Sequence, residues 1–331
     1  MSSTPVKVVP EQARPGESVQ HTSPLIGARF SPTGEYVIAG TQDNSLIRWN
    51  PAKKTKDALV AHKSWVRALA FVGKLLFSGD WAGRLIAWNY ADAKPAPVWD
   101  RNAHLGWLRA LAVSPDGKTL ASCGNDKLVK LWSIPEGKPL ATFSGHDWHV
   151  YNVAFHPDGK SLLSADLRGN VKEWDLAKGT VSRILDASIL YRYDQGFGAD
   201  IGGVRSMAFS PDGKWLACAG ITEVTNAFAG VGKPLVVLFD WVAGKTKTLL
   251  RPKTNFQGTA WGVAFHPSGF ILGVGGGSGG AFWAWKLEES LASFTLTLPN
   301  NARDLTVHPE GRYFTVPFEN GSLRMYDMGP K

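Results

Sequence analysis

Apolar residues in this chain come in short runs of about strand length, and tight turns separate the runs. One phrase recurs: an apolar residue, then Ser or His, then Pro-x-Gly. Proline presets the backbone of a β-turn, and glycine closes the turn without strain. Six copies lie at 30–34, 113–117, 155–159, 209–213, 265–269 and 307–311, and a shortened copy without proline lies at 71–74. The pattern predicts short strands joined by tight turns.

Two sets of anchors show that the phrase belongs to a repeat. The first anchors, at 30, 71, 113, 155, 209, 265 and 307, lie 41, 42, 42, 54, 56 and 42 residues apart. An aromatic second anchor follows each after 19, 17, 19, 19, 30, 20 and 19 residues: Trp49, Trp88, Trp132, Trp174, Phe239, Trp285 and Tyr326. Such a unit has room for four short strands, of which Leu128–Trp132 is one, but it cannot bury its apolar faces alone. Stacked repeats are therefore expected.

A third anchor, a histidine nine residues before the first anchor, occurs in the first four repeats. With these anchors, the chain resembles the WD40-repeat family over about residues 21–327. The resemblance implies an all-β fold, a seven-bladed β-propeller of four-stranded antiparallel blades. We expect residues 21–331 to hold seven WD-type repeats that form one propeller, and residues 1–20 to supply the closing strand. The last strand must come from there because only five residues follow Tyr326. Val6–Val9 is the preferred segment, and Glu17–Gln20 is the nearer one.

The repeated histidines have acidic and hydroxyl partners at regular distances. In the WD40 family, His, Ser or Thr, Asp and Trp form a hydrogen-bonded network inside the blade, and the resemblance implies the same here. The expected pairs are His21 with Asp43, His62 with Asp80, His104 with Asp126, and His146 with Asp166. Ser, His and Asp together also suit a hydrolase. The set recurs in four repeats, as a polar network inside each blade would, so we expect a structural role and no catalytic residue.

Two columns of residues are expected at one mouth of the central channel, because the family fold places the first strand of each blade there. Four residues before the first anchor stand Ile26, Arg67, Arg109, Tyr151, Arg205, Trp261 and Arg303; six before it stand Pro24, Trp65, Trp107, His149, Gly203, Thr259 and Asn301. Arginine and aromatic residues are enriched at interfaces, and arginine suits carboxylate and phosphate groups. The predicted partner-binding residues are Trp65, Arg67, Trp107, Arg109, His149, Tyr151, Arg205, Trp261 and Arg303.

Three further segments interrupt the repeat. Insertions near 186–202 and 221–233 are expected to be loops on the face of the channel mouth, and both should border the fifth blade. The glycine-rich run 273–280 resembles a phosphate-binding loop but has no Lys-Ser/Thr after it. We interpret this run as a loop between two strands of the sixth repeat.

Composition narrows the functional classes. The net charge is +8 with a pI near 9.4, which favours acidic partners. Two cysteines make no disulfide framework, and we expect no metal and no cofactor. The chain shows no apolar run of membrane-spanning length and no signal-peptide core, so a cytoplasmic location is expected and a membrane partner is not.

We therefore predict a non-catalytic interaction scaffold that binds an acidic or phosphorylated peptide or protein at the channel mouth. One alternative is an enzyme that uses the mouth as a pocket. Another is a basic propeller that associates with nucleic acid, which the scattered lysines argue against. The sequence does not determine the oligomeric state.

Overall fold

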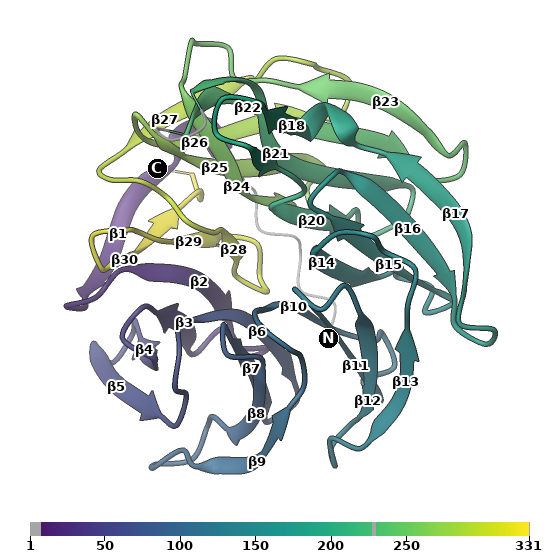
Figure 1. Cartoon of the computed structure of the whole chain (residues 1–331). Helices are drawn as coiled ribbons and strands as arrows, with labels where there is room; N and C mark the ends of the chain where they lie inside the picture. Colours follow the sequence, from purple (N-terminus) through teal and green to yellow (C-terminus); the bar gives the residue numbers. More distant parts are fainter. Residues whose placement is uncertain (1–7, 227–229, 331) are drawn as a thin grey trace.

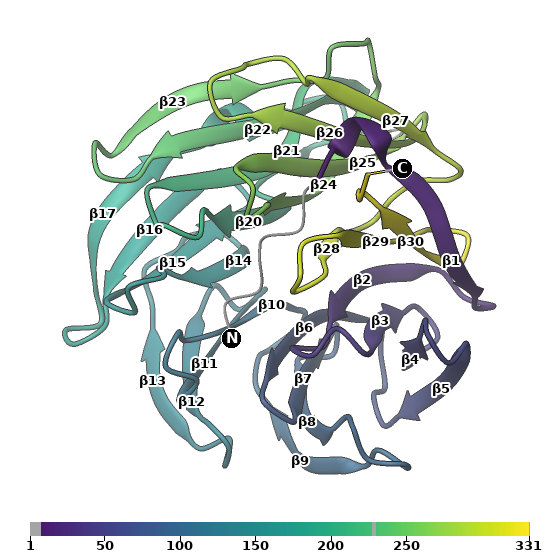
Figure 2. The ribbon, with the colours of Figure 1, turned by 180° about the vertical axis from the view of Figure 1, so that it is seen from behind.

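The computed structural model describes residues 8–226 and 230–330. Within them, seven four-stranded antiparallel sheets stand around a central channel, with their first strands innermost (Figure 1). The strands follow the chain order in blades 1 to 6. Figure 2 shows the same ring from behind. The fold is the seven-bladed propeller that the repeat spacing predicts.

Blades 1 to 4 come from the first half of the chain. Blade 1 contains β2 (Leu25–Phe30), β3 (Val37–Thr41), β4 (Ser45–Asn50) and β5 (Thr55–Val60). Blade 2 contains β6 (Val66–Val72), β7 (Leu75–Asp80), β8 (Arg84–Asn89) and β9 (Pro97–Asn102). Blade 3 contains β10 (Leu108–Val113), β11 (Thr119–Gly124), β12 (Val129–Ser133) and β13 (Pro139–Phe143). Blade 4 contains β14 (Val150–Phe155), β15 (Ser161–Asp166), β16 (Asn170–Asp175) and β17 (Thr180–Asp186).

The second half of the chain forms the remaining blades. Blade 5 contains β20 (Ser206–Phe209), β21 (Trp215–Asn226), β22 (Val231–Asp240) and β23 (Lys245–Leu250). Blade 6 contains β24 (Gly258–Phe265), β25 (Phe270–Gly277), β26 (Gly279–Lys286) and β27 (Phe294–Leu298). Blade 7 contains β28 (Thr306–Val307), β29 (Tyr313–Pro317), β30 (Ser322–Asp327) and the N-terminal β1 (Arg14–Gln20). Single 3₁₀ turns lie at Pro10–Gln12 and Ser188–Leu190.

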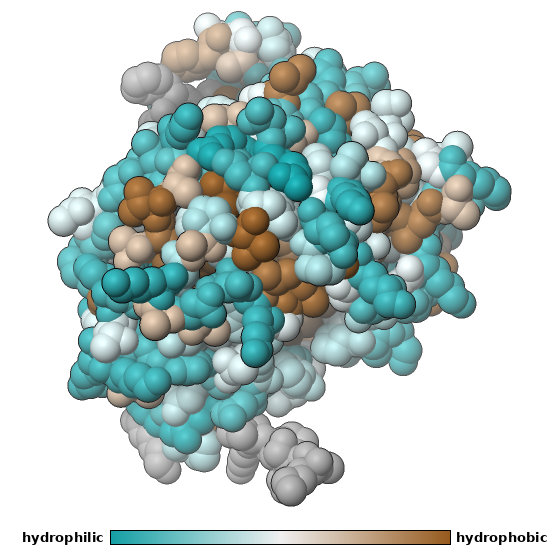
Figure 3. All heavy atoms as spheres, turned by 90° about the horizontal axis from the view of Figure 1, so that it is seen from below, coloured by the Kyte–Doolittle hydropathy of each residue, from teal (hydrophilic) through white to brown (hydrophobic). Residues whose placement is uncertain are grey.

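The core is divided into seven apolar clusters, one between each pair of neighbouring blades. Between blades 3 and 4, for example, Val129 and Leu131 of β12 pack with Val150 and Leu162. Alternate residues of a strand share a face, so each blade presents one apolar face to each neighbour. No blade could bury these faces without the next one, which is why closure of the ring matters. From the side, the surface is mostly hydrophilic with small hydrophobic patches (Figure 3).

The ring closes through β1, which pairs antiparallel with β30 from Arg14↔Asp327 to Gln20↔Ser322. The preference for Val6–Val9 as the closing strand was wrong: Val8 and Val9 lie outside any strand, and the first two residues of that segment lie outside the described residues. Residues 17–20 do belong to the closing strand. Proline and glycine at 15 and 16 are tolerated because β1 is an outer strand with a bulge there. The division of the chain into a closing segment, residues 1–20, and a propeller of seven repeats, residues 21–331, stays a prediction.

The insertions do not form the loops that we expected. The first forms a hairpin of β18 (Tyr191–Asp194) and β19 (Ala199–Gly202), and the second lengthens the β21–β22 hairpin. Paired strands satisfy the backbone groups that an irregular loop would leave to water. Phe228, which belongs to the second insertion, lies outside the described residues.

The glycine-rich run is also not a loop. Most of it pairs within β25 and β26, with Ser278 at the turn between them. Glycine is needed because the strands meet bulky neighbours: a Cβ on Gly275 would meet the Trp283 ring, and one on Gly276 would lie 2.9 Å from the Ala302 carbonyl oxygen. The run therefore makes room for close packing in blade 6.

Among the described residues, no helix has the length and apolar character needed to cross a membrane.

Candidate functional site

One column of the predicted channel residues lines a single pocket at the channel mouth. Its volume is about 260 Å³. The seven residues come from seven blades, at or just before the first strand of each: Ile26, Arg67, Arg109, Tyr151, Arg205, Trp261 and Arg303. The repeat places one residue of each blade at the same height, so positions far apart in the sequence share one cavity.

Aromatic rings hold the arginines in this pocket. The Arg109 guanidinium lies 4.2 Å from the Trp107 ring centroid and 4.3 Å from that of Tyr151. Arg205 lies 4.8 Å from the Tyr151 centroid and 5.3 Å from that of Trp261. These contacts stabilise the cations and occupy the guanidinium faces. The N–H edges remain as the groups that can bind a ligand.

Three of the arginines have no acidic partner within the described residues. Arg67 Nη1 donates to the Ile26 carbonyl oxygen at 3.0 Å, and Arg109 Nε donates to Asn125 Oδ1 at 2.8 Å. Among the described residues, the buried Nε of Arg205 has no hydrogen-bond acceptor. Each guanidinium has five N–H groups, so most of these donors stay available.

The pocket also carries uncompensated positive charge. Arg303 Nη2 lies 2.8 Å from Glu319 Oε1, which compensates that arginine alone. Burial, with a smaller effect from neighbouring arginines, lowers the pKa of Arg67 to about 10, although Asp304 opposes this lowering. Burial likewise lowers the pKa of Arg109 to about 10. Both side chains remain charged at neutral pH, so a bound anion would relieve their repulsion.

Of the second column, the residues six positions before the first anchor, only some line the pocket. Trp65 and Trp107 line it, whereas His149 lies outside the lining and its Nδ1 is 2.7 Å from the Asn125 carbonyl oxygen. Two lining residues were missed by the sequence reasoning, Gln42 and Trp81. Each directly follows the second strand of its blade, a position that also reaches the mouth.

Trp81 joins the tryptophans of blades 2 and 3. Its ring stacks on Trp107 at 3.7 Å and 9°, and it lies 4.5 Å from the Trp65 centroid. Trp65 as a whole residue remains 36% exposed. The stack gives the mouth a rigid aromatic wall beside its cationic wall. A ligand there can bury an apolar group next to an anionic one.

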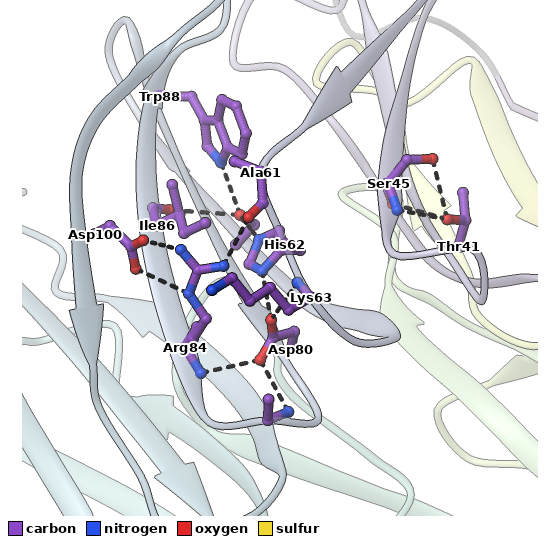
Figure 4. Close-up of polar contacts among 12 residues, drawn as sticks. Thr41, Ser45, Ala61, His62, Lys63, Asp80, Arg84, Ile86, Trp88 and Asp100 are labelled. Atoms are coloured by element: carbon purple, nitrogen blue, oxygen red, sulfur yellow. Dashed lines mark hydrogen bonds and ion pairs between the residues drawn. The ribbon is translucent and has the colours of Figure 1, made fainter.

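The repeated histidines lie inside the blades, away from this pocket lining. In blade 2, His62 Nδ1 is 2.9 Å from Asp80 Oδ2 and Nε2 is 2.6 Å from Ser78 Oγ (Figure 4). Trp88 Nε1 donates to the same hydroxyl at 2.8 Å. The carboxylate accepts from Nδ1–H, so Nε2 accepts the serine proton. The same chain of contacts joins His104, Asp126, Ser122 and Trp132 in blade 3, and His146, Asp166, Ser164 and Trp174 in blade 4.

Blade 1 has a looser version of the network. His21 Nε2 is 2.6 Å from Asp43 Oδ2. Ala39 stands where the other blades have the serine, and Thr41, two residues later, donates to Asp43 Oδ1 at 2.5 Å. Burial by itself would raise the pKa of Asp43. The hydrogen bonds from Ser45, Thr41 and His21 outweigh burial and lower this pKa to about 2.

These contacts favour a structural role over catalysis. A serine nucleophile needs access to substrate, but Ser78, Ser122 and Ser164 are fully buried. Burial lowers the pKa of His104 despite its aspartate partner. Burial also raises the pKa of the Cys123 thiol, which disfavours a reactive thiolate. Among the described residues, no three His, Cys, Asp or Glu side chains gather to hold a metal ion.

Replacing Asp126 with alanine is expected to lower the free energy of unfolding by about 1–3 kcal/mol, the cost of leaving buried donors without an acceptor. His104 Nδ1 at 2.8 Å and the Leu105 N–H at 3.2 Å both lose their partner. Urea unfolding measures the change. Partner binding by the folded variant should be unaffected. Unchanged stability with lost binding would contradict the structural role and make Asp126 a site residue.

The propeller is closed, and arginines and aromatic rings line the pocket at its channel mouth. The WD40 family model (WD domain, G-beta repeat) matches residues 16–50, 96–133, 137–175 and 197–221. These matches show WD40 repeats in four places along the chain, and the structure is the seven-bladed β-propeller that such repeats form.

Several curated proteins resemble part of the chain. Nuclear distribution protein PAC1 from Arthroderma benhamiae is 31% identical over 142 residues, 38% of this chain and 31% of the relative. A p21-activated protein kinase-interacting protein 1-like from Gallus gallus is 29% identical over 135 residues, 38% of this chain and 36% of the relative. Polyadenylation factor subunit 2 from Cryptococcus neoformans is 26% identical over 131 residues, 39% of this chain and 18% of the relative. The chain thus matches about a third of the first relatives' length. Family and names point to a non-enzymatic interaction scaffold.

Proposed function

We propose that this propeller is a non-catalytic scaffold that binds an acidic or phosphorylated segment of a partner protein at the channel mouth. The observation that carries the proposal is the group of three arginines, Arg67, Arg109 and Arg205, that line one pocket without an acidic partner among the described residues. Two of these cations, Arg109 and Arg205, lie over the Tyr151 ring. Arg67 and Arg205 lie over the Trp261 ring. Charge-assisted hydrogen bonds to a carboxylate or phosphate are the strongest contacts such a site can form.

The size of the pocket supports a side chain as its occupant. A volume of about 260 Å³ is below the roughly 300–1,000 Å³ of common cofactor and drug sites. One or two side chains of a peptide fit this space, and the rest of the partner can contact the rim. Trp65 at the rim adds an apolar contact of the kind that dominates interface energetics.

The relatives support a protein as the partner. One is named as a protein that interacts with a kinase, and another as a subunit of a polyadenylation factor. Association with another protein is the property that these names share. A cytoplasmic location belongs to the same proposal. We do not expect nucleic acid as the ligand, because the arginines of the mouth converge on one small pocket and form no extended basic track.

Partner capture tests the proposal. Wild-type protein, an Arg205→Ala variant and a Lys53→Ala, Lys54→Ala control are used as baits in a native lysate, and captured proteins are quantified by mass spectrometry. We expect acidic or phosphorylated partners to be depleted about tenfold or more on the Arg205→Ala bait, which corresponds to about 1.4 kcal/mol. The control lysines pair with Glu35 and Glu17 outside the pocket lining and should not matter. Equal capture by all three baits would contradict the proposal.

A further inference from the structure

Blades 2 to 7 each send one residue from their turn side towards the preceding blade. This residue stands two positions after the second anchor, and it packs in the apolar cluster between the two blades. In blades 2 to 7 the residues are Tyr90, Ile134, Leu176, Trp241, Leu287 and Met328. Their sizes differ widely, so the space between neighbouring blades is filled to different extents.

Between blades 4 and 5 the space is filled by a large ring. The Trp241 ring lies 5.4 Å from the His156 ring of blade 4, nearly parallel to it at 24°. Its edge-on contact with Phe209 is 5.2 Å between centroids. We call the position two residues after the second anchor the wedge position. Between blades 4 and 5 it accommodates an indole ring that is stacked on one side and packed edge-on on the other.

Two other interfaces are filled in related ways. Between blades 1 and 2, Tyr90 meets Phe71 at 4.9 Å and Tyr36 at 6.2 Å between ring centroids. Between blades 2 and 3 the wedge residue is the smaller Ile134, and Trp99 of β9 reaches across instead. Its Nε1 donates to the Pro135 carbonyl oxygen of blade 3 at 2.7 Å.

Between blades 3 and 4 no ring stands two positions after the second anchor, and the stacked rings of Phe143 and Trp174, 5.3 Å between centroids, lie outside the lining of the hollow described next. Leu176 stands in the wedge position, and Ser114 stands where blade 4 has His156. A hollow of about 380 Å³ opens there. It is lined by Ser114, Pro115, Asp116, Thr119, Leu131 and Leu140 of blade 3 and by Phe155, Asp158, Gly159 and Leu176 of blade 4. Phe155 is the one aromatic residue among the described residues that line the hollow. Leu140, also in the lining, is 57% exposed.

Two carboxylates stand in the wall of the hollow. Hydrogen bonds from the Ser114 hydroxyl and the Lys118 N–H lower the pKa of Asp116. The Lys160 N–H lowers that of Asp158, which also lies 2.8 Å from His156 Nδ1. Among the described residues, no lysine or arginine forms an ion pair with either carboxylate. This apolar hollow thus has an acidic rim on a protein whose net charge is +8.

We propose that the hollow between blades 3 and 4 binds an aromatic side chain of a partner protein that is flanked by lysine or arginine. The ring takes the place that Trp241 fills between blades 4 and 5, and the cation meets Asp116 and Asp158. The site shares no lining residue with the channel mouth, so it is a second and independent contact. Hydrophobic residues form small separate patches on the side of the molecule where blades 2 and 3 lie (Figure 3). A single anchored ring suits such a surface better than a broad apolar interface.

Small probes of opposite charge test the ring and the cation separately. Tryptamine carries an indole and an ammonium group, and indole-3-propionate carries the same ring with a carboxylate. Amide NMR shifts of the full chain are followed at constant ionic strength. We expect tryptamine to shift amides of blades 3 and 4 around the hollow, and to bind about tenfold tighter than indole-3-propionate. Shifts elsewhere only, or equal binding of both probes, would overturn the proposal.

Variants complete the test. Leu176→Trp fills the hollow from within, so tryptamine binding should be lost and the melting temperature should rise by about 2 °C or more. The matched control is Leu287→Trp, at an interface where Trp215 already packs, which should keep tryptamine binding. If Leu176→Trp does not fold, Asp116→Asn with Asp158→Asn serves instead and should abolish the preference for tryptamine. Unchanged tryptamine binding in a folded Leu176→Trp protein would exclude the site.

Discussion

Removing residues 1–20 is expected to lower the melting temperature by about 10 °C or more. The truncation deletes β1, which leaves β30 with an unpaired edge. It also removes Val8 and Ala13 from the cluster between blades 6 and 7, and Val19 from the cluster between blades 7 and 1. A buried valine such as Val8 contributes roughly 1.5 kcal/mol, the half-buried Val19 contributes less, and each ladder hydrogen bond contributes about 1 kcal/mol. Together they exceed roughly 5 kcal/mol, which supports a shift of that size.

The effect should reach beyond blade 7, because closure joins the last blade to the first. Arg14 Nη2 lies 2.6 Å from Asp327 Oδ2, so the closing strand is also held by an ion pair. Scanning calorimetry of the truncated and full chains measures the loss. A synthetic peptide of residues 1–20 added in trans should restore part of the stability, and the same peptide with Val19→Asp should not. A truncated chain that melts at the parent temperature would contradict closure by β1.

Much of the fold could be predicted because each blade must solve the same packing problem. The Pro-x-Gly turns and the aromatic anchors recur wherever a strand ends or a ring fills the space between blades. The seven residues four positions before the first anchor meet in one pocket for the same reason. The position in the repeat determines the position around the channel.

Other features depend on neighbours that the local sequence does not reveal. Val8 and Val9 have the higher strand propensity, but residues 14–20 pair with β30 because they meet its free edge. The glycines of blade 6 lie in strands whose neighbours leave no room for a Cβ: Trp283 faces Gly275, and Trp285 faces Gly273. The hollow beside Leu176 follows from the combined size of side chains from two blades, and no single repeat shows it.

Replacing Arg67 and Arg109 together with alanine is expected to weaken partner binding by about 30-fold to several-thousandfold. This range corresponds to roughly 2–5 kcal/mol, the cost of losing desolvated charged contacts. Both arginines are largely buried in the pocket, with no acid paired to them among the described residues, so a bound anion depends on them directly. A contact at the exposed rim would cost much less and would mainly slow association.

The measurement is the dissociation constant for a captured partner by isothermal titration calorimetry, after circular dichroism shows that the variant keeps its fold. Two controls match the change. Arg101→Ala removes an arginine that also lies over a tryptophan ring, 5.4 Å from the Trp99 centroid, but outside the pocket lining. Lys53→Ala with Lys54→Ala removes two charges from an outer turn. Both controls should bind within about threefold of the parent, which is less than 1 kcal/mol. If the lysine pair abolishes binding and the arginine pair does not, the partner binds the outer surface and the channel mouth is not the site.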